Sequence, residues 1–191
     1  MLSQRGLARN WNFIVYPDSA PENWRDILDE TRCEWLESPL HDQDVDPTGE
    51  RKKPHYHVTL LYPSQKSYGQ VKEFIDQLNS PIPIPCQSVK GSIRYMVHKD
   101  NPDKHQYEWN DIVCHGGADL TALCAPTHTE RLNMLDEILG FIRDNHITEF
   151  SDLTDMAQDM GNRDWLNVIL NHNTTAIKAI ISSRRHKRYD V

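Results

Sequence analysis

Apolar and polar residues alternate in short runs along the first two thirds of the chain, and these runs predict strands. The segment 10–16 (NWNFIVY) is rich in aromatic and β-branched residues and ends before Pro17, and the segment 54–62 (PHYHVTLLY) has the same character. Two shorter runs at 86–89 and 111–115 are flanked by proline or glycine. We therefore expect four strands in this part of the chain.

Apolar residues at helical spacing predict three helices between these strands. The first helix is expected between residue 19 and Pro39. Its apolar side would be formed by Trp24, Ile27, Leu28, Trp35 and Leu36. Ser67 is the expected N-cap of a second helix that runs to about Leu78, and the third helix is expected at 92–99.

The pattern changes after Pro126, where the apolar positions follow helical spacing throughout. Helical patterns are found at 129–146, 150–160 and 164–185. We expect one domain of residues 1–125 and a second of residues 126–191, with an α+β fold: an antiparallel sheet flanked by helices, then a small all-α module. The apolar stripe of 132–142 needs a partner, either the neighbouring helices or another subunit.

Length, cysteine usage and charge narrow the class of protein. The 191 residues carry a formal net charge of −7, and no apolar run approaches the roughly 18–20 residues of a membrane span. The N-terminus shows no secretory signal, and the four cysteines form no CxxC pair, so we expect a cytoplasmic protein with reduced thiols and no membrane partner. Residues 51–99 nevertheless hold 8 basic and 2 acidic residues, a local excess that suits phosphate binding.

Histidines and one carboxylate gather around the expected strand at 54–62. Alternate side chains of a strand share a face, so His55 and His57 point the same way. His41 and Asp44 precede them and are joined to them by a polar loop that suits a hairpin connection. Three imidazoles and a carboxylate suit Mn²⁺, Mg²⁺, Co²⁺ or Zn²⁺. The alternative is that the two histidines form only the polar face of a half-buried strand.

A tyrosine and a lysine on the third expected helix are candidates for the chemistry. Tyr95 and Lys99 would lie one turn apart on one face. A phenol is a weak nucleophile at neutral pH because its pKa is about 10, and a nearby ammonium group or metal ion favours the phenolate. Tyr107 is a rival nucleophile, and the Tyr95 ring could instead pack in the core. His98 and His105 are expected to be ordinary surface histidines.

These motifs resemble those of a known family. The segment 55–57 resembles the His-hydrophobe-His signature of HUH endonucleases, and the helix with Tyr95 and Lys99 resembles their single-tyrosine motif. The pair His41-x-x-Asp44 and the run 94–102 (RYMVHKDNP) bring the resemblance closer to plasmid rolling-circle replication initiators of the RepB type, over most of residues 8–125. Tyr56 stands where the family usually has a hydrophobic residue, and an aromatic ring fits there.

The resemblance implies a metal-dependent nickase that recognises double-stranded origin DNA and cleaves it as a single strand. It implies that the metal, Mn²⁺ before Mg²⁺ or Co²⁺, is held by His41, Asp44, His55 and His57. Tyr95 would attack the scissile phosphodiester, leaving a 5′-phosphotyrosyl link and a free 3′-OH primer, and Lys99 would assist. A homo-oligomer, such as a hexamer, and the host replication machinery are the implied partners.

Basic side chains near the expected metal site are candidates for contacts with DNA phosphates. They are Arg51, Lys52, Lys53, Lys66, Lys90 and Arg94. The alternative is a solvated basic surface without a partner. The basic segment 184–188 has the same two interpretations, a solvated tail or a further DNA contact.

Two other functions are compatible with parts of the sequence. A two-histidine phosphoesterase needs two His-x-Thr/Ser motifs, which 57–59 and 146–148 supply, although His146 ends a helical pattern. A non-catalytic DNA-binding or oligomerising protein would use the histidines for a structural metal. Metal-dependent cleavage with covalent capture of DNA on a tyrosine separates these functions from the nickase.

Overall fold

The computed structural model describes residues 6–186, and the chain divides into two compact units between Cys124 and Ala125. Each unit is described by itself. The first five residues, which bear on the expectation of no secretory signal, lie outside the described part. So do Lys187 and Arg188 of the basic tail.

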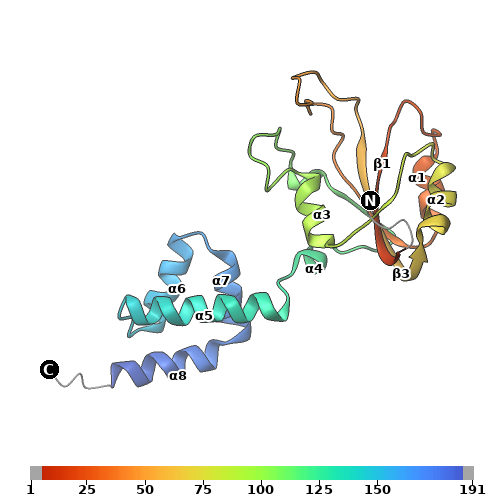
Figure 1. The fold of residues 1–191 in the computed structure, drawn as a ribbon. Helices are drawn as coiled ribbons and strands as arrows, with labels where there is room; N and C mark the ends of the chain where they lie inside the picture. Colours follow the sequence, from red (N-terminus) through yellow and green to blue (C-terminus); the bar gives the residue numbers. More distant parts are fainter. Residues whose placement is uncertain (1–5, 187–191) are drawn as a thin grey trace. The chain divides into compact units, whose positions relative to one another are not determined.

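The first unit is built on an antiparallel sheet of five strands in the order β4-β1-β3-β2-β5. Its strands are β1 (Leu7–Val15), β2 (Glu34–Glu37), β3 (Tyr56–Ser67), β4 (Ile84–Pro85) and β5 (Val113–His115). The long central pair β1–β3 runs in register from Val15 opposite Tyr56 to Asn10 opposite Leu61. Helices cover the sheet, and the expected α+β class is confirmed (Figure 1).

Four helices accompany this sheet. They are α1 (Trp24–Asp29), α2 (Tyr68–Asp76), α3 (Val89–Met96) and α4 (Leu120–Cys124), with a short 3₁₀ turn at Trp109–Asp111. Ser67 caps α2 as expected: its hydroxyl accepts from the Gln70 N–H, and the Gln70 side chain accepts from the Ser67 N–H. In this way the last residue of β3 also fixes where the next helix begins.

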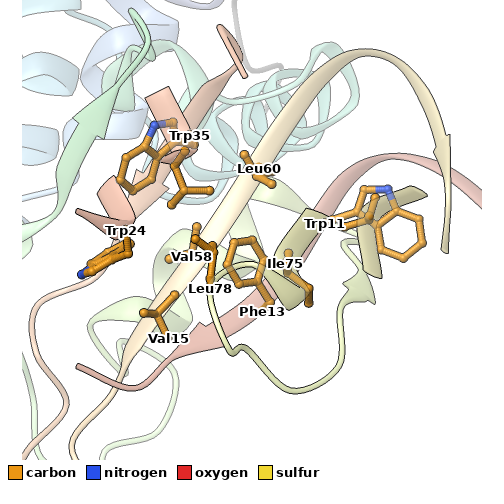
Figure 2. Packing of buried hydrophobic residues seen from close by; sticks show 11 residues of the cluster. Trp11, Phe13, Val15, Trp24, Trp35, Val58, Leu60, Ile75 and Leu78 are labelled. Atoms are coloured by element: carbon orange, nitrogen blue, oxygen red, sulfur yellow. The ribbon is translucent and has the colours of Figure 1, made fainter. Parts of the chain in front are cut away.

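The main core lies between one face of the sheet and the helices α1 and α2. Alternate residues of β1 and β3 point into it, and Figure 2 shows Trp11 and Phe13 of β1 beside Val58 and Leu60 of β3. Ile75 of α2 packs against them. This buried layer leaves the residues in between, on the opposite face, to meet α3.

The opposite face of the sheet carries a polar link to α3. The Asn12 amide of β1 donates to the Ser92 hydroxyl of α3 at 2.8 Å, and its oxygen accepts from the Thr59 hydroxyl of β3 at 2.8 Å. A smaller core that includes Leu36 and Ile93 continues this layer. The helix is thus held to the strand by directional bonds as well as by apolar packing.

The prediction of a single helix between residue 19 and Pro39 is wrong. The helix ends at Asp29, and Trp35 and Leu36 lie on β2. Trp35 enters the main core and Leu36 the smaller core under α3, so this strand is buried on both faces. Apolar residues on both faces of a short strand fit a helical spacing as well as a strand, and only the pairing with β3 decides between them.

The elements around α3 also differ from expectation. The strand expected at 86–89 is instead β4 at Ile84–Pro85, and the Ser88 hydroxyl caps α3. The helix therefore spans Val89–Met96 instead of 92–99. It stops because His98 adopts a left-handed backbone conformation with φ of 56°.

The second unit is all helical, as expected. Its helices are α5 (His128–Asp144), α6 (Phe150–Asp159), α7 (Arg163–Asn167) and α8 (Thr174–Arg185), with a π-helical turn at Val168–His172. Ile138 and Ile142 of the apolar stripe pack with the other helices of this unit, which supplies the partner for that part of the stripe, whereas Leu132 stays exposed. No helix among residues 6–186 is both long and apolar enough to cross a membrane.

Candidate metal centre and nucleophile

Three imidazoles meet where β3 begins. His41 and His55 form an isolated antiparallel bridge, with backbone N···O distances of 2.9 and 3.3 Å in the two directions. His57 follows on β3, so its ring shares a face with that of His55. The ring centroids of the three lie 4.7–5.4 Å apart, and one nitrogen of each lies within 4.8 Å of the others.

Asp44 lies beside His41 as a buried carboxylate. One of its oxygens is 3.4 Å from His41 Nδ1 and 3.6 Å from His98 Nε2. The structure therefore contains two overlapping groups that share His41, one with His55 and His57 and one with Asp44 and His98. The four residues expected to form the metal centre are all in this cluster, and His98 is a member that the sequence did not indicate.

Backbone carbonyls orient several of these imidazoles. His41 Nε2 donates to Met96 O at 2.8 Å, and His55 Nδ1 donates to Lys53 O at 2.9 Å. A carbonyl oxygen only accepts, so the bonded nitrogen carries the proton and the other nitrogen keeps a lone pair. This arrangement is typical of metal-binding histidines.

Burial keeps the rings of His41 and His57 uncharged. Desolvation lowers the pKa of His41 to about 4 and that of His57 to about 2, and neighbouring imidazoles add to the shift of His57. Within the described residues, the buried His41 Nδ1 has no hydrogen-bond partner. Neutral imidazoles with unused lone pairs beside a carboxylate fit a divalent ion of the Mn²⁺ to Zn²⁺ group.

Tyr95 stands at the edge of this cluster on the last turn of α3. Its ring centroid is 5.2 Å from that of His57, and the side chain is 41% exposed. The alternative of a tyrosine packed in the core is therefore wrong. Its hydroxyl accepts a hydrogen bond from Lys104 Nζ at 3.1 Å, and the same Nζ lies 4.7 Å from the ring centroid.

The expected pairing of Tyr95 with Lys99 on one helix face is wrong. The helix ends at Met96, and the left-handed His98 turns the chain before Lys99. The lysine that contacts the phenol is Lys104, in the irregular segment that follows. Its spacing of nine residues from Tyr95 corresponds to no helix or strand period, so the sequence held no signal for it.

Two further histidines and a second tyrosine lie in the segment that follows Tyr95. His98 is fully buried, which corrects its assignment to the surface, whereas His105 is exposed as expected. Tyr107 stacks on His41 with centroids 4.2 Å apart. Its hydroxyl donates to Asp44 at 3.4 Å, so this tyrosine is part of the wall of the cluster.

The basic residues expected to contact DNA are only partly gathered at the cluster. Arg51, Lys52 and Lys53 lie on the loop that joins His41 to His55, and Lys53 also forms an ion pair with Asp18 at 2.9 Å. The remaining three are placed elsewhere. Lys66 lies at the far end of β3, Lys90 in the first turn of α3, and Arg94 in an ion pair with Asp100. Their contact with DNA stays a prediction.

Comparison with known proteins identifies the family. Residues 3–121 match the family described as "Plasmid replication protein, origin binding domain", and residues 128–186 match "Replication protein RepB, C-terminal". The chain belongs to the RepB family of plasmid replication initiators.

Full-length relatives support the same family. A "Replication protein" of Staphylococcus aureus is 39% identical over 94% of this chain and 90% of its own length. A "Replication protein RepB" of Lactiplantibacillus plantarum is 39% identical over 94% of this chain and 82% of its own length. A "Replication protein RepB" of Streptococcus agalactiae is 25% identical over 90% of this chain and 86% of its own length.

As a RepB-family initiator, the chain has an origin-binding domain, and the histidine cluster with Tyr95 falls inside the residues that match it. The match fits the expected RepB resemblance and disfavours the two-histidine phosphoesterase. In the structure, the Thr59 hydroxyl is already bonded to Asn12, and His146 follows α5 in the second unit instead of lying on a strand.

Proposed function

We propose that this RepB-family initiator nicks one strand of the plasmid origin through Tyr95, with a divalent ion held by His41, Asp44, His55 and His57. The product is a 5′-phosphotyrosyl link and a free 3′-OH that primes synthesis. The family supplies origin binding. The nicking step rests on the side chains of the cluster.

The observation that carries this proposal is the position of the Tyr95 hydroxyl. It belongs to a half-exposed ring that touches the His57 ring, and it accepts a hydrogen bond from Lys104. A nucleophile must be reachable by a substrate that binds the neighbouring ion, and an exposed phenol at the edge of the cluster is reachable. Tyr107, by contrast, is stacked against His41.

The reaction is a transesterification that balances without a further reactant. The bond between Tyr95 Oη and phosphorus forms as the bond between phosphorus and the 3′-oxygen breaks. The phenolic proton passes to solvent, and the departing 3′-oxygen takes up a proton from water. Lys104 Nζ places positive charge beside Oη as negative charge develops on it. Lewis-acid polarisation of a phosphate oxygen is what a bound divalent ion supplies.

Mn²⁺ is the ion we assign to the centre, with Mg²⁺ or Co²⁺ as substitutes. The ligand set combines imidazole nitrogen with carboxylate oxygen, which suits Mn²⁺ and Co²⁺, whereas Mg²⁺ prefers oxygen alone. Selectivity among these ions also follows metal availability, so affinity alone does not define the native ion.

DNA phosphates would be held by the basic residues of the first unit. Arg51, Lys52 and Lys53 lie on the loop that also carries the cluster, where they can steer the scissile strand. Arg94 must exchange its contact with Asp100 for a phosphate, which costs little because exposed ion pairs contribute at most about 1 kcal/mol. Lys66 and Lys90 would extend the contact away from the cluster.

The second unit would assemble the initiator. It buries its own core and still exposes Leu132, Met156, Met160 and Leu170, which gives apolar surface for contact between copies. We assign it a homo-oligomer such as a hexamer, working with the host replication machinery in the cytoplasm.

Covalent capture of DNA tests the nickase. The full chain is incubated with Mn²⁺ and labelled single strands that tile the origin of its own plasmid. We expect a protein–DNA adduct that disappears with EDTA and in Tyr95→Phe and persists in Tyr107→Phe. An adduct that survives Tyr95→Phe would move the nucleophile elsewhere. Tight binding without cleavage of any strand would favour a non-catalytic origin-binding protein.

A further inference from the structure

His98 combines an unfavourable backbone conformation with a fully buried side chain. It occupies the position after the C-cap of α3, where helices most often place glycine, and its φ is 56°. Arg32, Asn79 and His146 adopt the same left-handed conformation in this chain. The backbone alone therefore marks no site, and the buried side chain is the part to examine.

The imidazole of His98 is held firmly by one nitrogen only. Nδ1 donates to the backbone oxygen of His105 at 2.7 Å, which leaves a lone pair on Nε2. Within the described residues, Nε2 is buried and has no hydrogen-bond partner. Buried polar atoms of this kind are rare in proteins unless an ion or a water satisfies them.

Nε2 is aimed at the carboxylate of Asp44. The two atoms are 3.6 Å apart, which is too long for a hydrogen bond. The same carboxylate oxygen lies 3.4 Å from His41 Nδ1, the second buried nitrogen without a partner. Ligand atoms of one ion lie about 3.0–3.6 Å apart when metal–ligand bonds are about 2.1–2.2 Å long.

We propose that His98 is a further ligand of the metal centre and binds the same ion as His41 and Asp44 through Nε2. This inference rests on the metal centre of the proposed function and adds a fifth protein ligand to it. His98 then links the ion directly to α3, because it follows the last turn of the helix that carries Tyr95. His98 is three residues from Tyr95, so one short segment of chain would hold both the nucleophile and the ion.

A structural role alone accounts poorly for these features. Glycine would make the same turn without backbone strain. An apolar side chain would fill the same space without burying a nitrogen that has no hydrogen-bond partner. The ring centroid of His98 lies 4.7 Å from that of His41 and 5.5 Å from that of Tyr95, so His98 is a neighbour of both residues.

Binding of Mn²⁺ to the full chain gives the first test. The variant His98→Gly keeps the left-handed turn and removes the imidazole, His57→Gln removes an assigned ligand, and His105→Gln removes an exposed imidazole of the same segment. Calorimetric titration should show Mn²⁺ affinity reduced about tenfold or more in the first two variants and unchanged in the third. Thermal unfolding of the metal-free proteins checks that His98→Gly is folded.

Histidine side-chain ¹⁵N resonances of the wild-type chain give the decisive test, because a residue that only supports Asp44 would also weaken affinity. Zn²⁺ is the diamagnetic probe, and His98→Gly assigns the signal. We expect the His98 Nε2 resonance to move from the unprotonated to the metal-bound position, together with those of the other ligands. If only the others move, His98 is not a ligand. If none moves, the metal centre itself fails.

Discussion

The ring of Tyr107 stacks face to face on the ring of His41, with centroids 4.2 Å apart and planes within 8° of parallel. Its hydroxyl points at the Asp44 carboxylate, at 3.4 Å. Burial raises the pKa of the Tyr107 phenol, which disfavours the phenolate that a nucleophile requires. Tyr107 is thus placed to support His41 and Asp44.

Substitutions at Tyr107 should show whether this residue supports metal binding or takes part in the cleavage of DNA. Tyr107→Phe keeps the stack and loses two hydrogen bonds, one donated to Asp44 at 3.4 Å and one accepted from the Gln43 N–H at 3.2 Å. Neither bond involves Tyr95, so covalent capture of DNA should stay within about threefold of wild type. Tyr107→Ala removes the stack, and we expect Mn²⁺ affinity to fall by about 10- to 100-fold, as for other residues that orient metal ligands. Titration with Mn²⁺ and gel analysis of adducts measure the two effects. Abolished capture in Tyr107→Phe with intact Mn²⁺ binding would make Tyr107 the nucleophile.

Lys104, and not Lys99, should matter for the rate of nicking. Lys104→Met removes the only ammonium group that the described residues place on the Tyr95 hydroxyl, and we expect single-turnover cleavage to slow by about 10- to 100-fold. Lys99→Met is the matched control, with the same change of charge nearby, and should stay within about threefold. Mn²⁺ affinity should be unchanged in both. Equal losses in the two variants would indicate a general effect of charge on DNA binding.

The metal-free protein should lose stability as the pH falls below about 6.5, the ordinary pKa of an unfolded histidine. Because the folded-state pKa values of His41 and His57 are lowered to about 4 and about 2, the unfolded chain binds more protons in this range. Each of the two histidines then contributes a slope of up to about 1.4 kcal/mol per pH unit.

Urea unfolding in EDTA at pH 7, 6 and 5 measures this slope. His57→Gln removes one of the two groups, so its stability should decline less steeply over the same range. An identical slope in the variant and the wild type would show that His57 titrates normally in the folded protein.

Gly116 should tolerate no side chain. Its φ is 62°, and an added Cβ would lie 2.2 Å from the backbone oxygen of Cys33, next to the pairing of β5 with β2. Gly116→Ala should lower the free energy of unfolding by about 3 kcal/mol. Gly117 has φ of 88° and open space around it, so Gly117→Ala should cost only about 1 kcal/mol. Urea unfolding of both variants compares the two costs, and equal values would contradict the close approach.

The sequence predicted those parts of the site that depend on a regular period. Strand alternation alone placed His55 and His57 on one face, and a hairpin connection was enough to bring His41 beside them. Ser67, as the expected N-cap, predicted the start of α2 for an equally local reason. In each case the geometry is set by neighbours in the chain.

The parts that escaped prediction depend on irregular backbone or on distant pairing. The spacing of Trp35 and Leu36 predicts a helix, and pairing with β3 makes them a strand. His98 is buried because the backbone makes a left-handed turn there, and a histidine in the sequence does not predict such a turn. Lys104 reaches Tyr95 through the loop that follows this turn, so its role depended on the same unforeseen conformation.

The amide of Asn12 acts as a spacer between the strand that carries His57 and the helix that carries Tyr95. It joins Thr59, two residues beyond His57 on β3, to Ser92, three residues before Tyr95 on α3. Apolar packing would let the helix slide over the sheet by fractions of an ångström, whereas two short hydrogen bonds to one planar group fix both offset and rotation. In the proposed mechanism, the reach of the Tyr95 hydroxyl is therefore set by Asn12, a residue outside the proposed set of metal ligands and nucleophile.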